Sequence, residues 1–344
     1  MHSNTNNFIF RLPQTLIRAV GIKEFNNFQF SQVNIIRKRS HVFNSTPLER
    51  AYFKISEDIV KSLNPKNYIE KINLFDDTLI LPDTAIIDYN ILTSSDIFSN
   101  IKKIKNIKVV PYESFVHNPV ATDLISALSF IKTLKRSYIF WSIHRPLYFY
   151  NWIDMITLNK FSYFLPWFWK PINLDIELYK FRLNIIAKQL SLKYDYMNKY
   201  LTSKNPILIQ LTEWPKKKTI IDNLEYAYNR SEVFRNSINT EGALIFLKPH
   251  RSVPKYVEFT AKKFRGVEII KPETLEESLI PSEILINSSV ENNPLIISEF
   301  SSSLFNFQSQ EFIGIRDSDY AKEFSRLALT FKRLSHSKLN RYFI

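Results

Sequence analysis

Cysteine is absent from this chain of 344 residues, and glycine is rare. Without cysteine there is no disulfide framework, no thiol nucleophile and no zinc site built on thiolates, which is typical of a reducing compartment. The glycines are too few and too far apart to form GxGxxG or the P-loop pattern; they are Gly21, Gly242, Gly266 and Gly314. The sequence therefore argues against dinucleotide and P-loop nucleotide chemistry.

Metal-ligand spacing, a signal peptide and long apolar runs are missing as well. The six histidines show no HExxH-like spacing, so we predict no structural metal; they are His2, His41, His117, His144, His250 and His336. The opening residues lack the basic region, apolar run and cleavage site of a signal peptide. No stretch reaches the roughly 18 uncharged apolar residues that a membrane span needs. We therefore expect a cytoplasmic protein.

Acidic residues are in the minority, 33 against 46 basic ones, so the formal net charge is +13. An excess of positive charge attracts an anionic partner, but it does not separate nucleic acid, acidic lipid headgroups and an acidic sugar nucleotide. Lysine and arginine are spread along the whole chain, and no RRM, KH or helix-turn-helix signature is present. Nucleic acid is therefore not an expected partner.

From about residue 206, short apolar runs alternate with amphipathic stretches, which indicates the strands and helices of a parallel sheet. The expected strands are 206–212, 243–249, 267–271, 294–300 and 311–316. The expected helices are 220–238, 254–264, 273–279 and the segment after Ser301. This pattern predicts a Rossmann-like domain over residues 204–316.

Residues 1–203 predict a second α/β domain. Residues 8–20 fit a strand that leads into a helix. Further elements are strands within 73–92, 104–114 and 137–144 and a helix at 120–135. Residues 141–171 contain four of the five tryptophans, a cluster that suits a core, a sugar-stacking surface or a membrane-surface element.

The last residues, 317–344, predict a basic helix. Its apolar residues Phe324, Leu327 and Leu334 share one face, with lysines and arginines around them. Such a helix can lie on an anionic membrane surface, or it can pack back across the two domains with its charges solvated. The two interpretations are compatible.

Two strand ends carry the polar residues best suited to a site. Lys248 and His250 end the expected strand 243–249, and three serines follow the expected strand 294–300; they are Ser301, Ser302 and Ser303. Open parallel sheets bind their ligands beyond the carboxyl ends of the strands. The serines open a helix, whose free N–H groups and hydroxyls can hold phosphate oxygens. His250 can donate a hydrogen bond or a proton to a departing phosphate, and Lys248 supplies positive charge.

The order of KPHR (248–251), IPSEILI (280–286) and EFSSSLF (299–305) resembles the bacterial sialyltransferase and polysialyltransferase families. Those families carry a His-Pro motif, a Pro-x-Glu segment and a serine-pair motif in that order. The strand and helix over residues 8–20 are similar to the opening of related lipooligosaccharide sialyltransferases. The resemblance is clearest over residues 206–316.

The resemblance implies a fold of the glycosyltransferase B type, α/β with two Rossmann-like domains facing a cleft. It implies inverting, metal-independent transfer of sialic acid from its CMP-activated form to a sugar hydroxyl, with no further cofactor. By the same resemblance, His250 and Lys248 bind or protonate the CMP phosphate, Ser301 to Ser303 hold that phosphate, and Glu283 accepts hydrogen bonds from the ribose. A carboxylate suits a ribose diol because it accepts two hydrogen bonds at once.

The sequence departs from that family at two points. Arg251 stands where the family has proline, and it can add a donor to the phosphate or to the sugar carboxylate. The acidic motif that supplies the general base in the family is absent. Glu113, after the apolar run in IKVVPYES, is our candidate for the base. Competing candidates are Asp88 in an expected turn, Asp123 as a helix cap, and Glu213.

The sequence is consistent with three hypotheses about function. The first is a sialyltransferase, or a transferase of a related keto sugar, that acts on a saccharide or glycolipid acceptor in capsule or lipopolysaccharide biosynthesis and associates peripherally with an anionic membrane surface. The second is an enzyme of the same fold with a different nucleotide sugar. The third is a protein without activity, either a capsule-assembly scaffold or a nucleic-acid binder.

Overall fold

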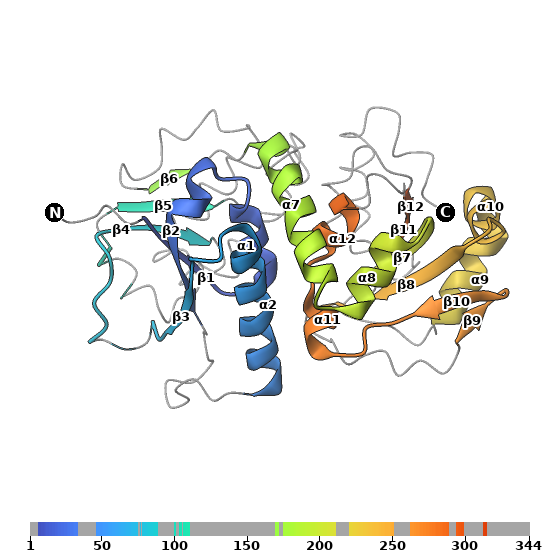
Figure 1. The fold of residues 1–344 in the computed structure, drawn as a ribbon, viewed down its shortest axis with the longest axis horizontal. Coiled ribbons are helices and arrows are strands. Elements are labelled where there is room, and N and C mark those ends of the chain that lie inside the picture. The colour runs from blue at the N-terminus through green and yellow to red at the C-terminus, as the bar shows by residue number, and fades with distance from the viewer. Residues whose placement is uncertain are drawn as a thin grey trace, which may run out of the picture. The chain divides into compact units, whose positions relative to one another are not determined.

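The computed structural model divides into two compact units, Met1–Arg182 and Leu183–Ile344 (Figure 1). It describes residues 6–33, 46–74, 76, 78–88, 100, 103–104, 106–110, 169–171, 175–210, 220–250, 262–288, 294–298 and 312–314. Within these residues each unit contains a six-stranded sheet with helices. The predicted α/β class with two Rossmann-like sheets is confirmed. The cleft between them stays a prediction.

The sheet of the first unit is parallel throughout its described strands, in the order β3-β2-β1-β4-β5-β6. The strands are β1 (Asn6–Phe10), β2 (Phe28–Val33), β3 (Ile69–Ile72), β4 (Thr84–Asp88), β5 (Asn106–Val110) and β6 (Trp169–Pro171). This is the doubly wound order, and the strand order reverses between β1 and β4. That point is where such sheets bind their ligands.

Helix α1 (Pro13–Ala19) follows β1, as predicted, and contacts α2 (Pro47–Leu63). The sequence analysis missed α2, although its start has a clear signal. The Thr46 hydroxyl accepts a hydrogen bond from the Glu49 amide at 3.2 Å, and the Glu49 carboxylate accepts one from the Thr46 amide at 3.2 Å. This capping box satisfies two backbone donors, and Pro47 suits the first helical position.

Phenylalanines fill much of the first core, together with one buried arginine. The rings in contact are Phe8, Phe10, Phe25, Phe28 and Phe30. Phe25 lies in a 3-10 helix, η1 (Lys23–Asn27), and Arg182 of α7 (Ile176–Ser191) covers its ring. The Arg182 guanidinium also donates to the backbone carbonyls of Val20, Ile22 and Lys23. The first part of α7 is thereby attached to the first unit.

The second sheet has the order β12-β11-β7-β8-β10-β9 in its described residues. The strands are β7 (Asn205–Gln210), β8 (Ala243–Lys248), β9 (Lys263–Phe264), β10 (Val267–Ile270), β11 (Leu295–Ser298) and β12 (Phe312–Gly314). All pairs are parallel except β9 with β10. The parallel strands again follow a doubly wound order, which reverses between β7 and β11. All five strands predicted for this domain are confirmed.

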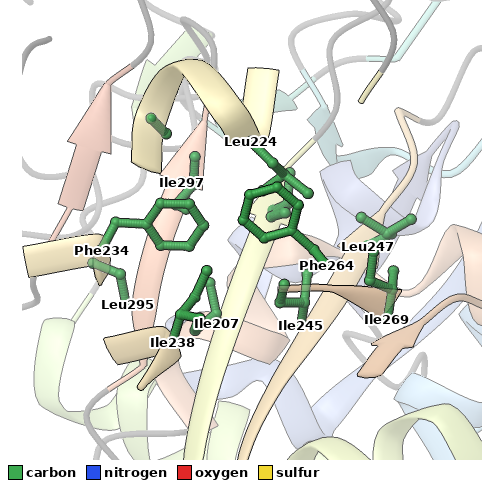
Figure 2. Close-up of a cluster of buried hydrophobic side chains, with 12 residues drawn as sticks. Ile207, Leu224, Phe234, Ile238, Ile245, Leu247, Phe264, Ile269, Leu295 and Ile297 are labelled. Carbon is green, nitrogen blue, oxygen red and sulfur yellow. The ribbon is translucent and has the colours of Figure 1, made fainter. Parts of the chain in front are cut away.

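Alternate residues of the second sheet pack against different helices, as the twofold repeat of a strand requires. One face packs against α9 (Ile220–Arg230) and α10 (Glu232–Ile238). Figure 2 shows the labelled side chains of this core, from Ile207 and Ile245 to Phe234 and Phe264, pointing toward one another. Both faces of the sheet are buried, which explains why its strands are nearly continuous apolar runs.

The opposite face packs against α8 (Asp195–Thr202). The rings of Tyr196 and Tyr200 meet that of Phe246 edge-on, at 5.8 and 5.0 Å between centroids. The Tyr196 hydroxyl also donates to the Leu247 carbonyl oxygen at 2.9 Å. These contacts attach α8 to the second unit. The sequence analysis instead assigned these residues to the first domain, with a boundary after residue 203.

Two of the expected helices differ from the structure. The stretch 220–238 breaks at Ser231, whose hydroxyl accepts from the Phe234 amide and begins α10. The end of the expected helix 254–264 is strand β9, because Arg265 and Gly266 form the two-residue turn to β10 with φ of 51° and 88°. Positive φ at both positions is the geometry of a tight hairpin. The helices α11 (Leu275–Leu279) and α12 (Ser282–Ser288) follow, and the former was predicted.

Several predicted elements fall outside the described residues. These are the strand at 137–144, the helix at 120–135, the helix after Ser301 and the basic helix at 317–344. Of the tryptophan-rich segment 141–171, only β6 is described. These expectations stay predictions.

Candidate functional site

Polar residues end neighbouring strands at the carboxyl edge of the second sheet. In the register of the sheet, Gln210 of β7 pairs with Lys248 of β8 on one side and with Ser298 of β11 on the other. The three strand ends therefore form one row, and the row includes the point between β7 and β11 where the strand order reverses. An open α/β sheet binds its ligand at such a point. Strand β7 lies between β8 and β11, the two strands after which the sequence predicts the site residues.

Lys248 is the charged residue of this row, and only 4% of its surface is exposed. Lys248 lies two residues after Phe246 on β8, so its side chain is on the same face of the sheet, which α8 covers. The Nζ atom donates to the carbonyl oxygen of Pro249 at 2.8 Å and to that of Ser278 in α11 at 2.7 Å. The ammonium thereby links the end of β8 to the last turn of α11. The sequence analysis expected it at the phosphate.

Burial lowers the pKa of Lys248 from its ordinary value of 10.5 to about 7, because the charged form loses its hydration. The negative charge of Glu283 acts in the opposite direction and raises this pKa. A lysine with such a pKa is partly neutral near physiological pH. It differs from the permanent positive charge expected from the sequence.

Glu283 lies in the first turn of α12, next to the same row of strand ends. The Gln210 side-chain amide donates to the Ser282 hydroxyl at 3.4 Å, and that hydroxyl donates to a Glu283 carboxylate oxygen at 3.4 Å. Glu283 is half-buried. The structure thus brings Lys248 and Glu283, 35 residues apart in sequence (283 − 248), to one side of one sheet edge.

The segment before Glu283 is held by a buried carboxylate, that of Glu277. Glu277 accepts from the backbone amides of Glu273 at 2.8 Å, Thr274 at 3.2 Å and Tyr196 at 3.0 Å. Thr274 in turn caps the start of α11 by accepting from the Glu277 amide. One carboxylate therefore joins the start of α11 to the start of α8. This arrangement fixes the start of α11 relative to α8.

His250 follows β8 by two residues and is half-buried. Its preceding residue, Pro249, is buried, and the Pro249 carbonyl oxygen is the one bound by Lys248. The buried ammonium therefore holds the backbone directly before the His250 imidazole. A half-buried imidazole at a strand end can reach a ligand and still be held in one place.

The other predicted site residues are outside the described part of the chain. They are Glu113, Arg251, Ser301, Ser302 and Ser303, together with the competing bases Asp123 and Glu213. Asp88 is described, and the expectation of a turn was wrong. It is the last residue of β4, in register with Val110 of β5. The strand continues to Asp88 because β5 pairs with β4 along its whole length.

Sequence reasoning missed Gln210, Ser278 and Ser282 at this edge. Gln210 had a detectable signal, because it is the polar residue that ends an apolar run predicted as a strand. Ser282 lies inside the IPSEILI segment, next to the residue that was chosen. Ser278 acts through its backbone carbonyl, so no side-chain pattern indicates it.

Among the described residues, no group of three or more histidine, aspartate or glutamate side chains is arranged to hold a metal ion. Among the helices of that part of the chain, none combines the length and the apolar character needed to cross a membrane.

No family model matches the chain, and no curated protein matches it. Among solved structures it is similar to an α/β-galactoside α-2,3-sialyltransferase from the luminous marine bacterium Photobacterium phosphoreum. That match has 15% identity and a TM-score of 0.45 and covers 97% of this chain and 96% of that chain. The chain is also similar to the structure of S. aureus MnaA with UDP, with 11% identity and a TM-score of 0.38. That match covers 94% of this chain and 82% of that chain. At these values the two likenesses assign this chain no family and no activity.

Proposed function

We propose that this protein is an inverting, metal-independent glycosyltransferase that moves sialic acid, or a related keto sugar, from its CMP-activated donor to a sugar hydroxyl. The observation that supports the proposal is that Glu283 acts on the charge of Lys248 at the carboxyl end of β8, two residues before His250, in a doubly wound sheet. The order of the three sequence motifs around them supports the choice of donor.

Each residue has a stated role in donor binding. His250 donates a hydrogen bond or a proton to the phosphate as negative charge develops on it. Glu283 accepts hydrogen bonds from the ribose hydroxyls. Ser301, Ser302, Ser303 and Arg251 complete the phosphate contacts. Lys248 is left out of the direct ligands, because two carbonyl oxygens already bind its buried Nζ atom.

The reaction forms one bond and breaks one. The acceptor hydroxyl oxygen attacks the anomeric carbon of the donor sugar, and the bond from that carbon to the phosphate oxygen breaks. CMP leaves with the electron pair, and the configuration at the anomeric carbon inverts. A carboxylate of the first unit takes the hydroxyl proton, for which Glu113 is our candidate and Asp88, at the end of β4, the strongest competitor.

The acceptor is proposed to be a saccharide or glycolipid of a capsule or lipopolysaccharide. The net charge of +13 suits both an acidic glycan and an anionic membrane surface. We also propose that the enzyme is cytoplasmic and associates peripherally with that membrane surface.

Turnover of CMP-sialic acid tests the function directly. The purified chain is incubated with the donor in the presence of EDTA, with and without a galactose-ended or sialylated acceptor, and released CMP is measured. We expect release that the acceptor stimulates, that His250→Ala abolishes and that the exposed-site control Lys271→Met retains. Comparison of Glu113→Gln with Asp88→Asn identifies the base.

Three other outcomes have distinct meanings. CMP binding without turnover, together with release of nucleotide from a UDP-sugar, favours an enzyme with another donor. Binding without any turnover favours a scaffold. Absence of both CMP binding and turnover contradicts the proposal.

A further inference from the structure

The buried ammonium of Lys248 connects two segments that carry different parts of the proposed donor site. On one side it binds the carbonyl of Pro249, the residue directly before His250. On the other side it binds the carbonyl of Ser278, in the last turn of α11. From Ser278 the chain runs through buried residues to Ser282 and Glu283 in the first turn of α12.

The bond to Pro249 fixes the peptide unit between Pro249 and His250. Its carbonyl can no longer rotate freely, so the direction in which His250 leaves the strand is defined. The bond to Ser278 holds the end of α11, where the junction to α12 begins, and the adjacent Glu277 holds the start of the same helix. His250 and Glu283 are therefore positioned through one shared side chain.

A direct contact of Lys248 with a phosphate is disfavoured in this arrangement. Two of the three N–H donors of the ammonium already bind carbonyl oxygens, and a phosphate oxygen in the place of either would take that hydrogen bond from the carbonyl. The side chain is also almost completely covered by protein, at 4% exposure. The geometry favours an indirect role.

We propose that Lys248 is a positioning residue that couples the His250 turn to the α11–α12 junction, and so sets the phosphate side and the ribose side of the nucleotide site together. This inference rests on the proposed function, in which His250 meets the phosphate and Glu283 the ribose. It names a residue through which both act.

Binding of two ligands to the full-length chain separates positioning from direct contact. CMP carries the phosphate, and cytidine lacks it. Isothermal titration calorimetry is performed with both on the wild type, Lys248→Met, Lys248→Arg and the control Lys271→Met. Lys271 is exposed and directly follows β10, so it matches Lys248 in residue type and lies, like Lys248, at the carboxyl end of a strand.

The Lys248→Met variant is expected to bind both ligands more weakly, CMP by about tenfold and cytidine by a smaller factor, because CMP uses both positioned sides and cytidine only the ribose side. Lys248→Arg is expected to recover most of both affinities, since its donors can reach both carbonyls. A loss confined to CMP would show a direct phosphate contact and overturn the inference. Unchanged affinities for both ligands would overturn it as well.

A measurement without ligand keeps this test independent of the proposed function. The imidazole resonances of His250 are recorded by NMR in the free protein, and the fold of each variant is checked by circular dichroism. We expect Lys248→Met to displace these resonances, whereas Lys248→Arg and Lys271→Met leave them in place. Unmoved resonances in folded Lys248→Met refute positioning even if the wild type binds neither ligand. If Lys248→Met does not fold, Lys248→Gln takes its place with the same expected results.

Discussion

Replacement of Lys248 by methionine should remove a defined part of the pH dependence of stability in the second unit. Burial lowers the pKa of this lysine from 10.5 to about 7 in the native state. Between those two pH values the unfolded chain holds a proton that the native chain has released. Because stability rises with pH wherever the unfolded state binds more protons, the wild type becomes more stable from about pH 7 upward.

The size of the effect follows from the two pKa values. Each pH unit in the window where only the unfolded state is protonated contributes about 1.4 kcal/mol. From pH 6 to pH 9, with a native pKa of about 7, the free energy of unfolding rises by about 2.5 kcal/mol from this group. Methionine has no proton to release, so the variant loses this increment. The two carbonyls it leaves without a donor, those of Pro249 and Ser278, lower stability by an amount that does not change with pH.

Hydrogen exchange followed by mass spectrometry is the suitable assay, because it reports on each unit separately. Peptides that cover β7 and β8 are followed from pH 6 to pH 9, with correction for the intrinsic exchange rate. The free energy of opening should rise with pH more steeply in the wild type and in Lys271→Met than in Lys248→Met. If the wild type and Lys248→Met gave parallel curves over this range, the assignment of a buried lysine with a lowered pKa would be refuted.

Two further predictions concern the cores of the units. Phe234→Ala should lower the stability of the second unit by about 3 to 5 kcal/mol, because the ring is fully buried and stacks on Phe264 with 6.2 Å between the ring centroids. Denaturant titration measures this loss, and a value below about 1 kcal/mol would contradict the packing. Arg182→Met should cost about 1 to 3 kcal/mol, because three backbone carbonyls lose their donor. Faster exchange of amides in η1 is the measurement, with the exposed Lys180→Met as the control; equal protection in the two variants would refute the anchoring role.

Much of the second unit could be predicted from the sequence, because its strands are buried on both faces. Runs such as PILIQLT and ALIFLKP have few polar residues to interrupt them, and each became a strand within a residue or two of its expected bounds. The weaker strands of the first unit escaped prediction. β3 is four residues long with two exposed charged side chains, and β6 has three residues, so neither has a periodic pattern of its own.

The candidate site was only partly accessible from the sequence. His250 and Lys248 were chosen from a strand end and Glu283 from a family resemblance, and the charge of Glu283 acts on Lys248 at the end of β8. Their partners were not predictable, because Ser278 contributes a backbone carbonyl and Gln210 reaches Ser282 across 72 residues. Contacts of this kind depend on which strands become neighbours.

The sequence by itself determined the strands of the second unit, since these follow from the local spacing of apolar residues. It also determined which residue types stand at the ends of the strands. Only the tertiary structure decided that β7 lies between β8 and β11, and that the charge of Lys248 is buried against two carbonyls. The physical reason is that desolvation and hydrogen bonding of a side chain arise from segments distant in sequence, and a local pattern does not record them.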